Sequence, residues 1–260
     1  MLRRLPLYQE MVFSLFYRFG GSSAHVLGQG IGTDAELANN YFRFVHARDP
    51  RNESIWLSLD ANSLANSQSA RVRVQWLLRQ SRQREAALVW KKYLALRKDD
   101  WLRKNFVDNA GFEAAPVPGE GYDWVVEASP VTRITRVDDV HSEGNHSLRI
   151  DFDGSQNVAF RNVSQSLWLE PGRYRLQASV RAEAITTDEG IRLQFSGPGN
   201  SNAVTESVTG TSDWHRIRAS FTILTAGPGQ ILLIRRPSTR FENRPRGSVW
   251  LDDMEISPVR

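Results

Sequence analysis

The chain has 260 residues, of which 40% are hydrophobic and 24% charged, which is a normal composition for one large or two ordinary globular domains. It contains no Cys, and this excludes disulfides, thiolate metal sites and a Cys nucleophile. The net charge of +4 is unevenly divided: residues 1–104 carry 17 Lys and Arg against 9 Asp and Glu, and residues 105–260 carry 16 against 20. This change of charge indicates a domain boundary near residue 104.

At the N-terminus, two Arg precede apolar residues as in a signal peptide, but Gln9 and Glu10 interrupt the apolar run. We therefore expect an amphipathic helix with no clear signal peptide, and a degenerate signal ending near Ala24 remains the alternative. No apolar run reaches the roughly 20 residues that span a membrane, so we expect no transmembrane segment. The basic residues are scattered at helical spacing, which favours surface cations over a nucleic-acid site.

Residues 1–104 show helical periodicity throughout. Thr33 or Asp34 is expected to cap a helix that runs to Ala47, and further helices are expected over 53–64, 70–79 and 82–97. Residues 20–32, rich in Gly and Ser, are expected to form a connector, and residues 62–69 a polar break. In the second helix, the residues expected to face inward are Ile55, Trp56, Leu59 and Leu64.

Part of this helical region resembles tetratricopeptide repeats, which are helical hairpins of about 34 residues. Ala38, Phe42, Val45 and Pro50 match the second-helix positions of that family, and Trp56 then matches the first-helix Trp of a following unit. The pattern recurs in Ala86, Trp90 and Leu94, but Ser81 replaces the usual turn Gly and Lys98 the usual Pro. The resemblance implies a helical-hairpin array that docks a protein partner. The alternative is a short helical scaffold that packs on its neighbour.

From residue 105 onward, apolar residues recur at every second position instead of at helical spacing. Apolar and polar residues alternate over 148–152, 174–183, 191–195 and 216–223, and less regular strands are expected over 123–128, 131–137, 158–169, 230–236 and 248–256. Turn signals such as Glu170-Pro171-Gly172 and Gly227-Pro228-Gly229 separate them. The fold class is therefore α+β in separate domains: helical hairpins over 1–104, then an antiparallel β-sandwich over 105–260.

The sandwich region resembles jelly-roll carbohydrate-binding modules of the cellulose- and xylan-binding type, because several motifs of that family follow in family order. The opening motif is Asn109 to Glu113, followed by Trp124; Gly144 to Leu148 and Gln165 to Tyr174 come next. Trp214 follows, and the last motif is Val249 to Ile256. Ala110 departs from the family by replacing a Gly. The resemblance implies a polysaccharide ligand, although folds of this class also serve protein and lipid ligands.

The resemblance also implies a structural Ca²⁺, which requires six to eight oxygen ligands. Its matching carboxylates are Glu113 and either Asp252 or Asp253. The alternative is that Glu113 pairs with a nearby Arg and that one Asp caps the end of a strand.

A sugar platform needs an accessible aromatic ring together with polar groups that bind hydroxyls. Trp168 and Trp214 lie on predicted strands with polar neighbours, so partial exposure is expected, whereas Trp124 is expected in the core. The alternative is that each Trp is buried. The predicted ligand-binding residues are Trp168, Trp214, Arg216, Arg218 and Tyr122.

No catalytic motif is present, and the cluster formed by Asp138, Asp139, His141 and His146 fits no common metal spacing. We therefore predict a non-catalytic protein that binds bacterial polysaccharide through the sandwich and docks a partner through its helices. A periplasmic or cell-envelope location, in exopolysaccharide assembly, is favoured. A pure protein-interaction scaffold is the alternative, and a glycoside hydrolase is a further one.

Overall fold

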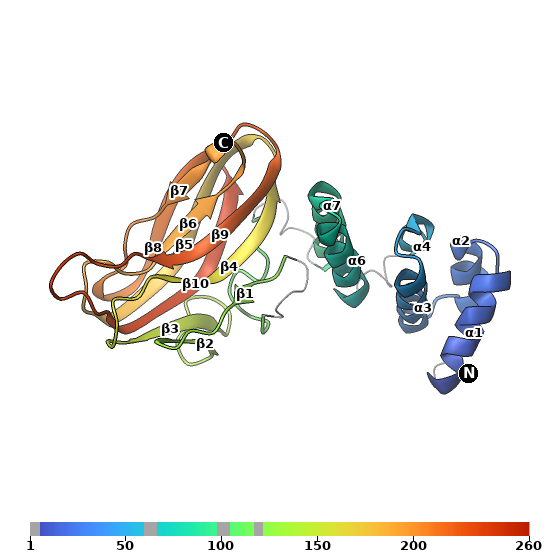
Figure 1. Ribbon diagram of the computed structural model, residues 1–260, viewed down its shortest axis with the longest axis horizontal. Helices are drawn as coiled ribbons and strands as arrows, with labels where there is room; N and C mark the ends of the chain where they lie inside the picture. Colours follow the sequence, from blue (N-terminus) through green and yellow to red (C-terminus); the bar gives the residue numbers. More distant parts are fainter. Residues whose placement is uncertain (1–5, 60–66, 98–104, 117–121, 260) are drawn as a thin grey trace. The chain divides into compact units, whose positions relative to one another are not determined.

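The computed structural model describes residues 6–59, 67–97, 105–116 and 122–259, which fall into two compact units, Met1–Asp99 and Asp100–Arg260. Within the described residues the α-helices lie in the first unit and the β-strands in the second (Figure 1). The predicted fold class, helices followed by an antiparallel sandwich, is confirmed.

The helices of the first unit follow the predicted periodicity closely. Asp34 caps the helix after it, since its Oδ1 accepts from the backbone N–H groups of Glu36 and Leu37, both at 3.1 Å. The main helices are α1 (Pro6–Phe19), α3 (Ala35–Arg48), α4 (Glu53–Leu57), α6 (Ser67–Arg79) and α7 (Gln83–Arg97).

The prediction that residues 20–32 form a connector is wrong, because a short helix α2 (Ser23–His25) continues into a π-helix η2 (Val26–Ile31). The physical reason is burial: Val26 and Leu27 enter the core of the unit, and the Ser22 hydroxyl caps α2 by accepting from the His25 N–H. The polar break is also shorter than predicted, since α6 begins at Ser67. The helix expected over 53–64 is also shorter than predicted, since α4 ends at Leu57. Leu64 lies outside the described residues, and Ile55, Trp56 and Leu59 are buried as expected.

Aromatic rings and an ionic network hold these helices together. Phe42 of α3 contacts Trp56 of α4 edge-on, with ring centroids 5.9 Å apart. Glu53 accepts from Arg73 of α6 at 3.2 Å and from Arg82 at 2.8 Å, so one carboxylate joins three segments. The guanidinium of Arg73 is buried and also donates to the Pro50 carbonyl at 2.9 Å.

Helices α6 and α7 are joined by a tight turn at Ser81. The N–H of Arg82 donates to the Leu77 carbonyl at 2.9 Å, and Ser81 has a φ of 58°. This left-handed conformation is the one that Gly adopts most easily at the end of a helix. Ser81 therefore takes the conformation expected of the Gly that it replaces, and the tetratricopeptide resemblance itself stays a prediction.

The second unit contains two five-stranded antiparallel sheets (Figure 1). Sheet A has the order β1-β4-β9-β6-β7, and sheet B has the order β2-β3-β10-β5-β8. The short edge strand β7 was not predicted. The strands are β1 (Val125–Val126), β2 (Thr132–Val137), β3 (Ser147–Asp153), β4 (Phe160–Leu169), β5 (Gly172–Ile185), β6 (Arg192–Ser196), β7 (Asn202–Val204), β8 (Gly210–Ile223), β9 (Gly227–Arg235) and β10 (Arg246–Pro258).

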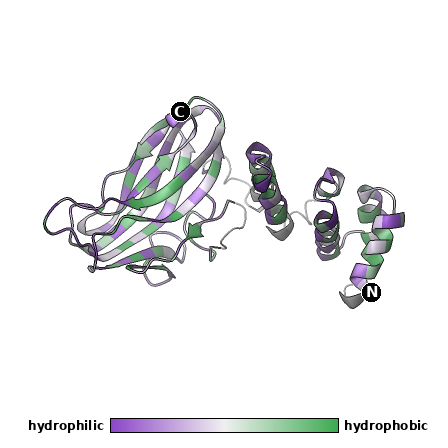
Figure 2. Cartoon of the chain, in the orientation of Figure 1, coloured by the Kyte–Doolittle hydropathy of each residue, from purple (hydrophilic) through white to green (hydrophobic). Residues whose placement is uncertain are grey.

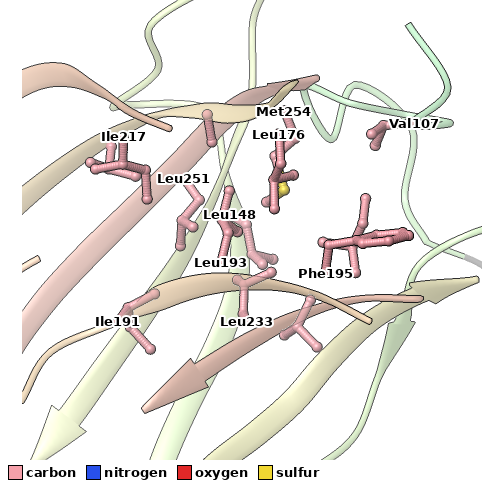
Figure 3. Close-up of a cluster of buried hydrophobic side chains, with 14 of the residues drawn as sticks. Val107, Leu148, Leu176, Ile191, Leu193, Phe195, Ile217, Leu233, Leu251 and Met254 are labelled. Carbon is pink, nitrogen blue, oxygen red and sulfur yellow. The ribbon is translucent and has the colours of Figure 1, made fainter. Parts of the chain in front are cut away.

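The core of the sandwich lies between the two sheets. Hydrophobic and hydrophilic residues alternate along the strands (Figure 2), so that one face of each sheet is apolar. Leu193 and Leu233 of sheet A meet Leu176 and Leu251 of sheet B in this layer (Figure 3), and all four are fully buried. The opposite, outer faces of the two sheets are not filled by this core.

Candidate ligand-binding faces

The five predicted ligand-binding residues do not form one site. Tyr122 is only 6% exposed, and burial raises the pKa of its hydroxyl. Trp168 is half-buried and lies on β4 of sheet A, whereas Trp214, Arg216 and Arg218 lie on β8 of sheet B. A common platform for these side chains is therefore excluded by the topology. Trp168 and Trp214 therefore belong to different sheets, and each sheet has its own outer face.

The outer face of sheet A, which we call the neutral face, carries amides and hydroxyls. One row across the strands runs through Ser164, Leu232 and Gln194, and a second runs through Ser166, Gln230, Ser196 and Asn202. Gln194 Nε2 lies 3.1 Å from Ser196 Oγ and 3.3 Å from Asn202 Oδ1, so the two rows are hydrogen-bonded to each other.

Trp168 stands at the end of the neutral face, opposite Pro228 of β9. Its Nε1 donates to a Glu170 carboxylate oxygen at 3.2 Å, which fixes the indole at this edge. Arg192 also lies on this face, and Glu189 forms an ion pair with it at 2.6 Å. The neutral face therefore combines hydrogen-bonding groups and one aromatic ring with little net charge.

The outer face of sheet B, which we call the charged face, has a different composition. Trp250 lies there, but it is only 3% exposed because the Arg149 and Arg181 guanidinium carbons cover its ring, 5.1 and 5.4 Å from the centroid. The Arg residues that project from this face, as the strand register shows, are Arg133, Arg149, Arg173, Arg175, Arg181, Arg216, Arg218 and Arg246. Its acidic residues include Asp151, Asp153, Glu183, Asp253 and Glu255.

Trp124 is fully buried, as expected. Its ring centroid lies 5.2 Å from that of Phe112, and its Nε1 donates to the Asn109 carbonyl at 3.2 Å. The opening motif is thus a folding element: the Asn109 side chain is hydrogen-bonded to the backbone of Ala114 in both directions, at 2.8 and 3.0 Å. It forms a closed loop around the Trp and leaves the aromatic ring inaccessible to a ligand.

The predicted metal carboxylates are separated by a β-bulge. The pairing of β10 with β5 shifts between Asp252 and Glu255, and Asp253 has a φ of 45°. Asp252 is buried, whereas Asp253 accepts a hydrogen bond from Arg216 and forms an ion pair with it. Glu113 and Asp252 both border Gly111, where a Cβ would lie 3.7 Å from the Glu113 Oε1 and 3.1 Å from the Asp252 Oδ1.

The loop between β2 and β3 supplies N–H donors to both of these carboxylates. Asp252 Oδ2 accepts from Ser142 and Glu143, at 2.7 and 2.9 Å, and Glu113 Oε1 accepts from Asn145 and His146, at 2.9 and 3.2 Å. Among the described residues, the alternative pairing of the Glu113 carboxylate with an Arg is not found: Arg136 donates instead to the Phe112 and Glu113 carbonyls.

Burial raises the pKa of Asp252 despite its backbone donors. Burial also acts to raise the pKa of Glu113, but donors from Asn145 and His146 outweigh it, and the net pKa is lowered. A buried carboxylate beside a second one fits the preference of Ca²⁺ for hard oxygens, and Glu113 and Asp252 would be its side-chain ligands. Among the described residues, however, no group of three or more His, Asp or Glu is suitably placed for a metal, so backbone carbonyls would have to complete the shell.

No protein-family model matches the sequence, and no curated protein matches it. Among helices of the described residues, none is both long and apolar enough to cross a membrane.

Solved structures that resemble the chain include carbohydrate-binding modules. TmCBM61 in complex with β-1,4-galactotriose is 17% identical, with 60% of this chain and 99% of that chain covered and a TM-score of 0.39. The CBM22-1 xylan-binding domain of Xyn10C from Paenibacillus barcinonensis is 12% identical, with coverages of 58% and 92% and a TM-score of 0.36. A CBM4 module is 14% identical, with coverages of 59% and 99% and a TM-score of 0.39. The strand pairings described above, rather than these likenesses, establish the β-sandwich.

Proposed function

We propose that the sandwich is a non-catalytic module that binds a polysaccharide on its neutral face. The observation that carries this proposal is the contrast between the two outer faces. The outer face of sheet B carries many Arg and acidic side chains, whereas sheet A presents Gln, Ser and Asn side chains around Leu232. Solvation alone does not require a row of neutral amides on a sheet surface. Such amides can, however, form hydrogen bonds with a ligand that is rich in hydroxyl groups.

The chemistry of the neutral face matches that of an uncharged glycan. Gln230 offers a carbonyl oxygen and two N–H donors to adjacent sugar hydroxyls. Gln194 offers its carbonyl oxygen, because its Nε2 already donates to Ser196 and Asn202. Leu232 lies between Ser164 and Gln194 and offers an apolar patch to the C–H groups of a pyranose. Trp168 extends this apolar contact at the edge of the face. Several weak contacts along a row suit a polymeric ligand better than a single sugar.

The helical unit supports the second part of the proposal, the docking of a protein partner. Four apolar side chains of α1 are spaced by three or four residues and are at least half exposed, which places them on one side of the helix: Tyr8, Met11, Leu15 and Phe19. We propose that a partner protein of a bacterial envelope or exopolysaccharide assembly covers this row. If the sandwich binds no glycan, the same row favours the scaffold alternative.

The test is a glycan-array screen of the full chain, followed by calorimetry with the best neutral polysaccharide. We expect Gln194→Ala and Gln230→Ala each to weaken binding by about tenfold, because each removes hydrogen bonds to the ligand. Gln177→Ala is the matched control, since Gln177 lies on the charged face and donates to Glu255 at 2.6 Å. Binding that is equally strong in all three variants would overturn the assignment of the neutral face.

A further inference from the structure

The loop between β9 and β10 presents an aromatic ring entirely to solvent. The loop is otherwise hydrophilic and projects from the end of the sandwich (Figure 1). Phe241, near its middle, is 100% exposed, more than any other large hydrophobic residue of the described chain. Exposing a Phe gives no benefit to folding, because the ring could be replaced by any polar residue without loss of contacts.

The base of this loop is held by a buried cation. Arg235, the last residue of β9, is only 2% exposed. Its guanidinium donates to the Glu189 carbonyl at 2.8 Å, to the Asn243 carbonyl at 3.1 Å and to the Thr187 hydroxyl at 3.3 Å. The contact with Asn243 is made within the loop itself, so Arg235 fixes the backbone two residues after Phe241.

Two further sets of hydrogen bonds fix the sides of the loop. On one side, Ser238 donates its N–H to the Asn157 Oδ1 at 2.9 Å and its hydroxyl to an Asp188 oxygen at 2.6 Å. On the other, the Thr186 hydroxyl accepts from the Arg246 N–H at 3.1 Å and donates to the Arg244 carbonyl at 3.3 Å. The exposed ring is therefore carried by a preorganised loop, which lowers the entropic cost of binding a ligand.

An open pocket of about 720 Å³ lies beside the ring. Its polar groups are two guanidinium groups, one carboxylate, one amide and one hydroxyl. We propose that this loop pocket is a second binding site, which takes a carboxylate-bearing sugar residue of an acidic polysaccharide. The pocket is lined by Gly154, Thr186, Phe241, Glu242, Asn243, Arg244 and Arg246.

The chemical class follows from the lining. Phe241 offers a flat apolar surface to one face of a pyranose ring, and Arg244 offers the planar pair of N–H donors that matches a carboxylate. Within the described part of the chain, the Arg244 guanidinium makes no hydrogen bond or ion pair, so its donors are available to a ligand. The nearby Arg240 is neutralised by Asp188 at 3.0 Å, and Arg246 lies opposite Asp153 across the sheet.

This inference rests on the proposed carbohydrate-binding function but uses a different surface, so the two can fail separately. The test measures binding of the full chain to polygalacturonate and to its fully methyl-esterified form, which is uncharged. We expect polygalacturonate to bind and the ester to bind about tenfold more weakly, because the ester cannot pair with Arg244 as an anion. Phe241→Ala and Arg244→Gln should each weaken polygalacturonate binding about tenfold.

Matched controls lie at the opposite end of the sandwich. Leu224→Ala removes another exposed apolar side chain, and Arg173→Gln removes another exposed Arg. Arg173 lies near the start of β5, whereas the pocket lies beyond the end of that strand. Both controls should bind polygalacturonate like the unmodified protein. The Phe241 and Arg244 variants should keep its melting temperature, since both side chains are exposed.

Three results would overturn the inference. The first is no binding of polygalacturonate; the second is binding that Phe241→Ala and Arg244→Gln leave unchanged. The third is binding to vesicles of phosphatidylcholine and phosphatidylserine in place of polygalacturonate, lost in the same two variants, which would assign the loop to an anionic membrane surface. In each of these cases, the neutral-face proposal would still be supported if a neutral glycan binds through Gln194 and Gln230.

Discussion

Asp252 and Asp253 are consecutive residues of β10, yet their carboxylates both lie on the outer side of sheet B. Asp252 is buried and accepts from the Ser142 and Glu143 N–H groups, whereas Asp253 pairs with Arg216 on the charged face. The bulge that follows Asp252 makes this possible, because it changes the alternation of the strand. One dipeptide therefore anchors the β2–β3 loop and neutralises a surface cation at the same time.

The first prediction concerns calcium. If Ca²⁺ binds to Glu113 and Asp252, millimolar Ca²⁺ should raise the melting temperature of the protein by a few degrees, on the order of 3 °C, because the ion binds the folded state alone. Glu113→Gln and Asp252→Asn should abolish this increase. Asp253→Asn is the matched control and should preserve it, since Asp253 is already paired with Arg216. Differential scanning calorimetry with Ca²⁺ and with a chelator measures the effect.

A melting temperature that is the same with Ca²⁺ and with chelator would contradict the prediction. It would mean that the four backbone N–H groups of the β2–β3 loop are sufficient partners for the two carboxylates. In that case Asp252→Asn should still destabilise the sandwich, by about 2 kcal/mol, because the amide nitrogen cannot accept from the loop.

Most strands of the sandwich could be predicted from the sequence, because each has one buried face and one wet face. The alternation of Tyr174, Leu176, Ala178, Val180 and Ala182 places five buried side chains on one side of β5. β7 could not be predicted in this way. It has three residues, of which only Ala203 is buried, so no period can be recognised.

The ligand-binding residues were harder to predict, because sequence patterns show which side of a strand is wet but not which sheet contains the strand. Trp168 and Trp214 have similar polar neighbours, yet the strand order places them on different sheets. Gln194 and Gln230 come together only through the pairing of β6 with β9. Phe241 lies in a polar loop, and its full exposure depends on hydrogen bonds to Arg235, Ser238 and Thr186, which the sequence does not reveal.

The second prediction concerns the turn between α6 and α7. Ser81 is exposed and has a φ of 58°, a conformation that is unfavourable for residues with a Cβ. Ser81→Gly should therefore stabilise the helical unit, by about 1 kcal/mol, because Gly adopts this conformation without strain. Ser81→Val should destabilise it. Chemical denaturation followed by circular dichroism measures both variants, and a Gly variant less stable than the original would refute the strain argument.

The third prediction concerns pH. Burial, with a smaller contribution from the Arg73 charge, lowers the pKa of His46 to about 4, although Asp49 acts in the opposite direction. Because the unfolded chain has the ordinary His pKa of about 6.5, protons bind the unfolded state preferentially between these values. The stability of the helical unit should therefore fall as the pH decreases from about 6.5, level off below about 4, and lose at most about 3 kcal/mol.

The check for His46 is a pair of measurements. The ring of His46 packs against Phe42 and Trp76, with centroids 5.3 and 5.9 Å apart, so His46→Phe should be accommodated by the same aromatic surroundings. The difference in unfolding free energy between the two proteins should grow as the pH falls from 6.5 to 4. A difference that does not change with pH, or a His46 ring that titrates near 6.5 by nuclear magnetic resonance, would contradict the lowered pKa.

The last prediction concerns Arg235, the buried anchor of the β9–β10 loop. Arg235→Lys keeps the charge but replaces a planar group of five donors by an ammonium with three, so the carbonyls of Glu189 and Asn243 cannot both remain satisfied. We expect a loss of about 3 kcal/mol in unfolding free energy. We also expect faster amide hydrogen exchange in residues 236–245, and weaker polygalacturonate binding because Phe241 is no longer held.

The neighbouring residue provides the control for this change. Arg236 is exposed, so Arg236→Lys should leave stability, exchange and binding unchanged. If Arg235→Lys weakens binding while exchange in the loop stays slow, Arg235 does not act by fixing the loop. If exchange becomes faster while binding is unchanged, the rigidity of the loop has no part in recognition. Only faster exchange in the loop together with weaker polygalacturonate binding would connect the buried guanidinium of Arg235 to the exposed ring of Phe241. That result would show that a buried residue of the sandwich determines how the loop binds its ligand.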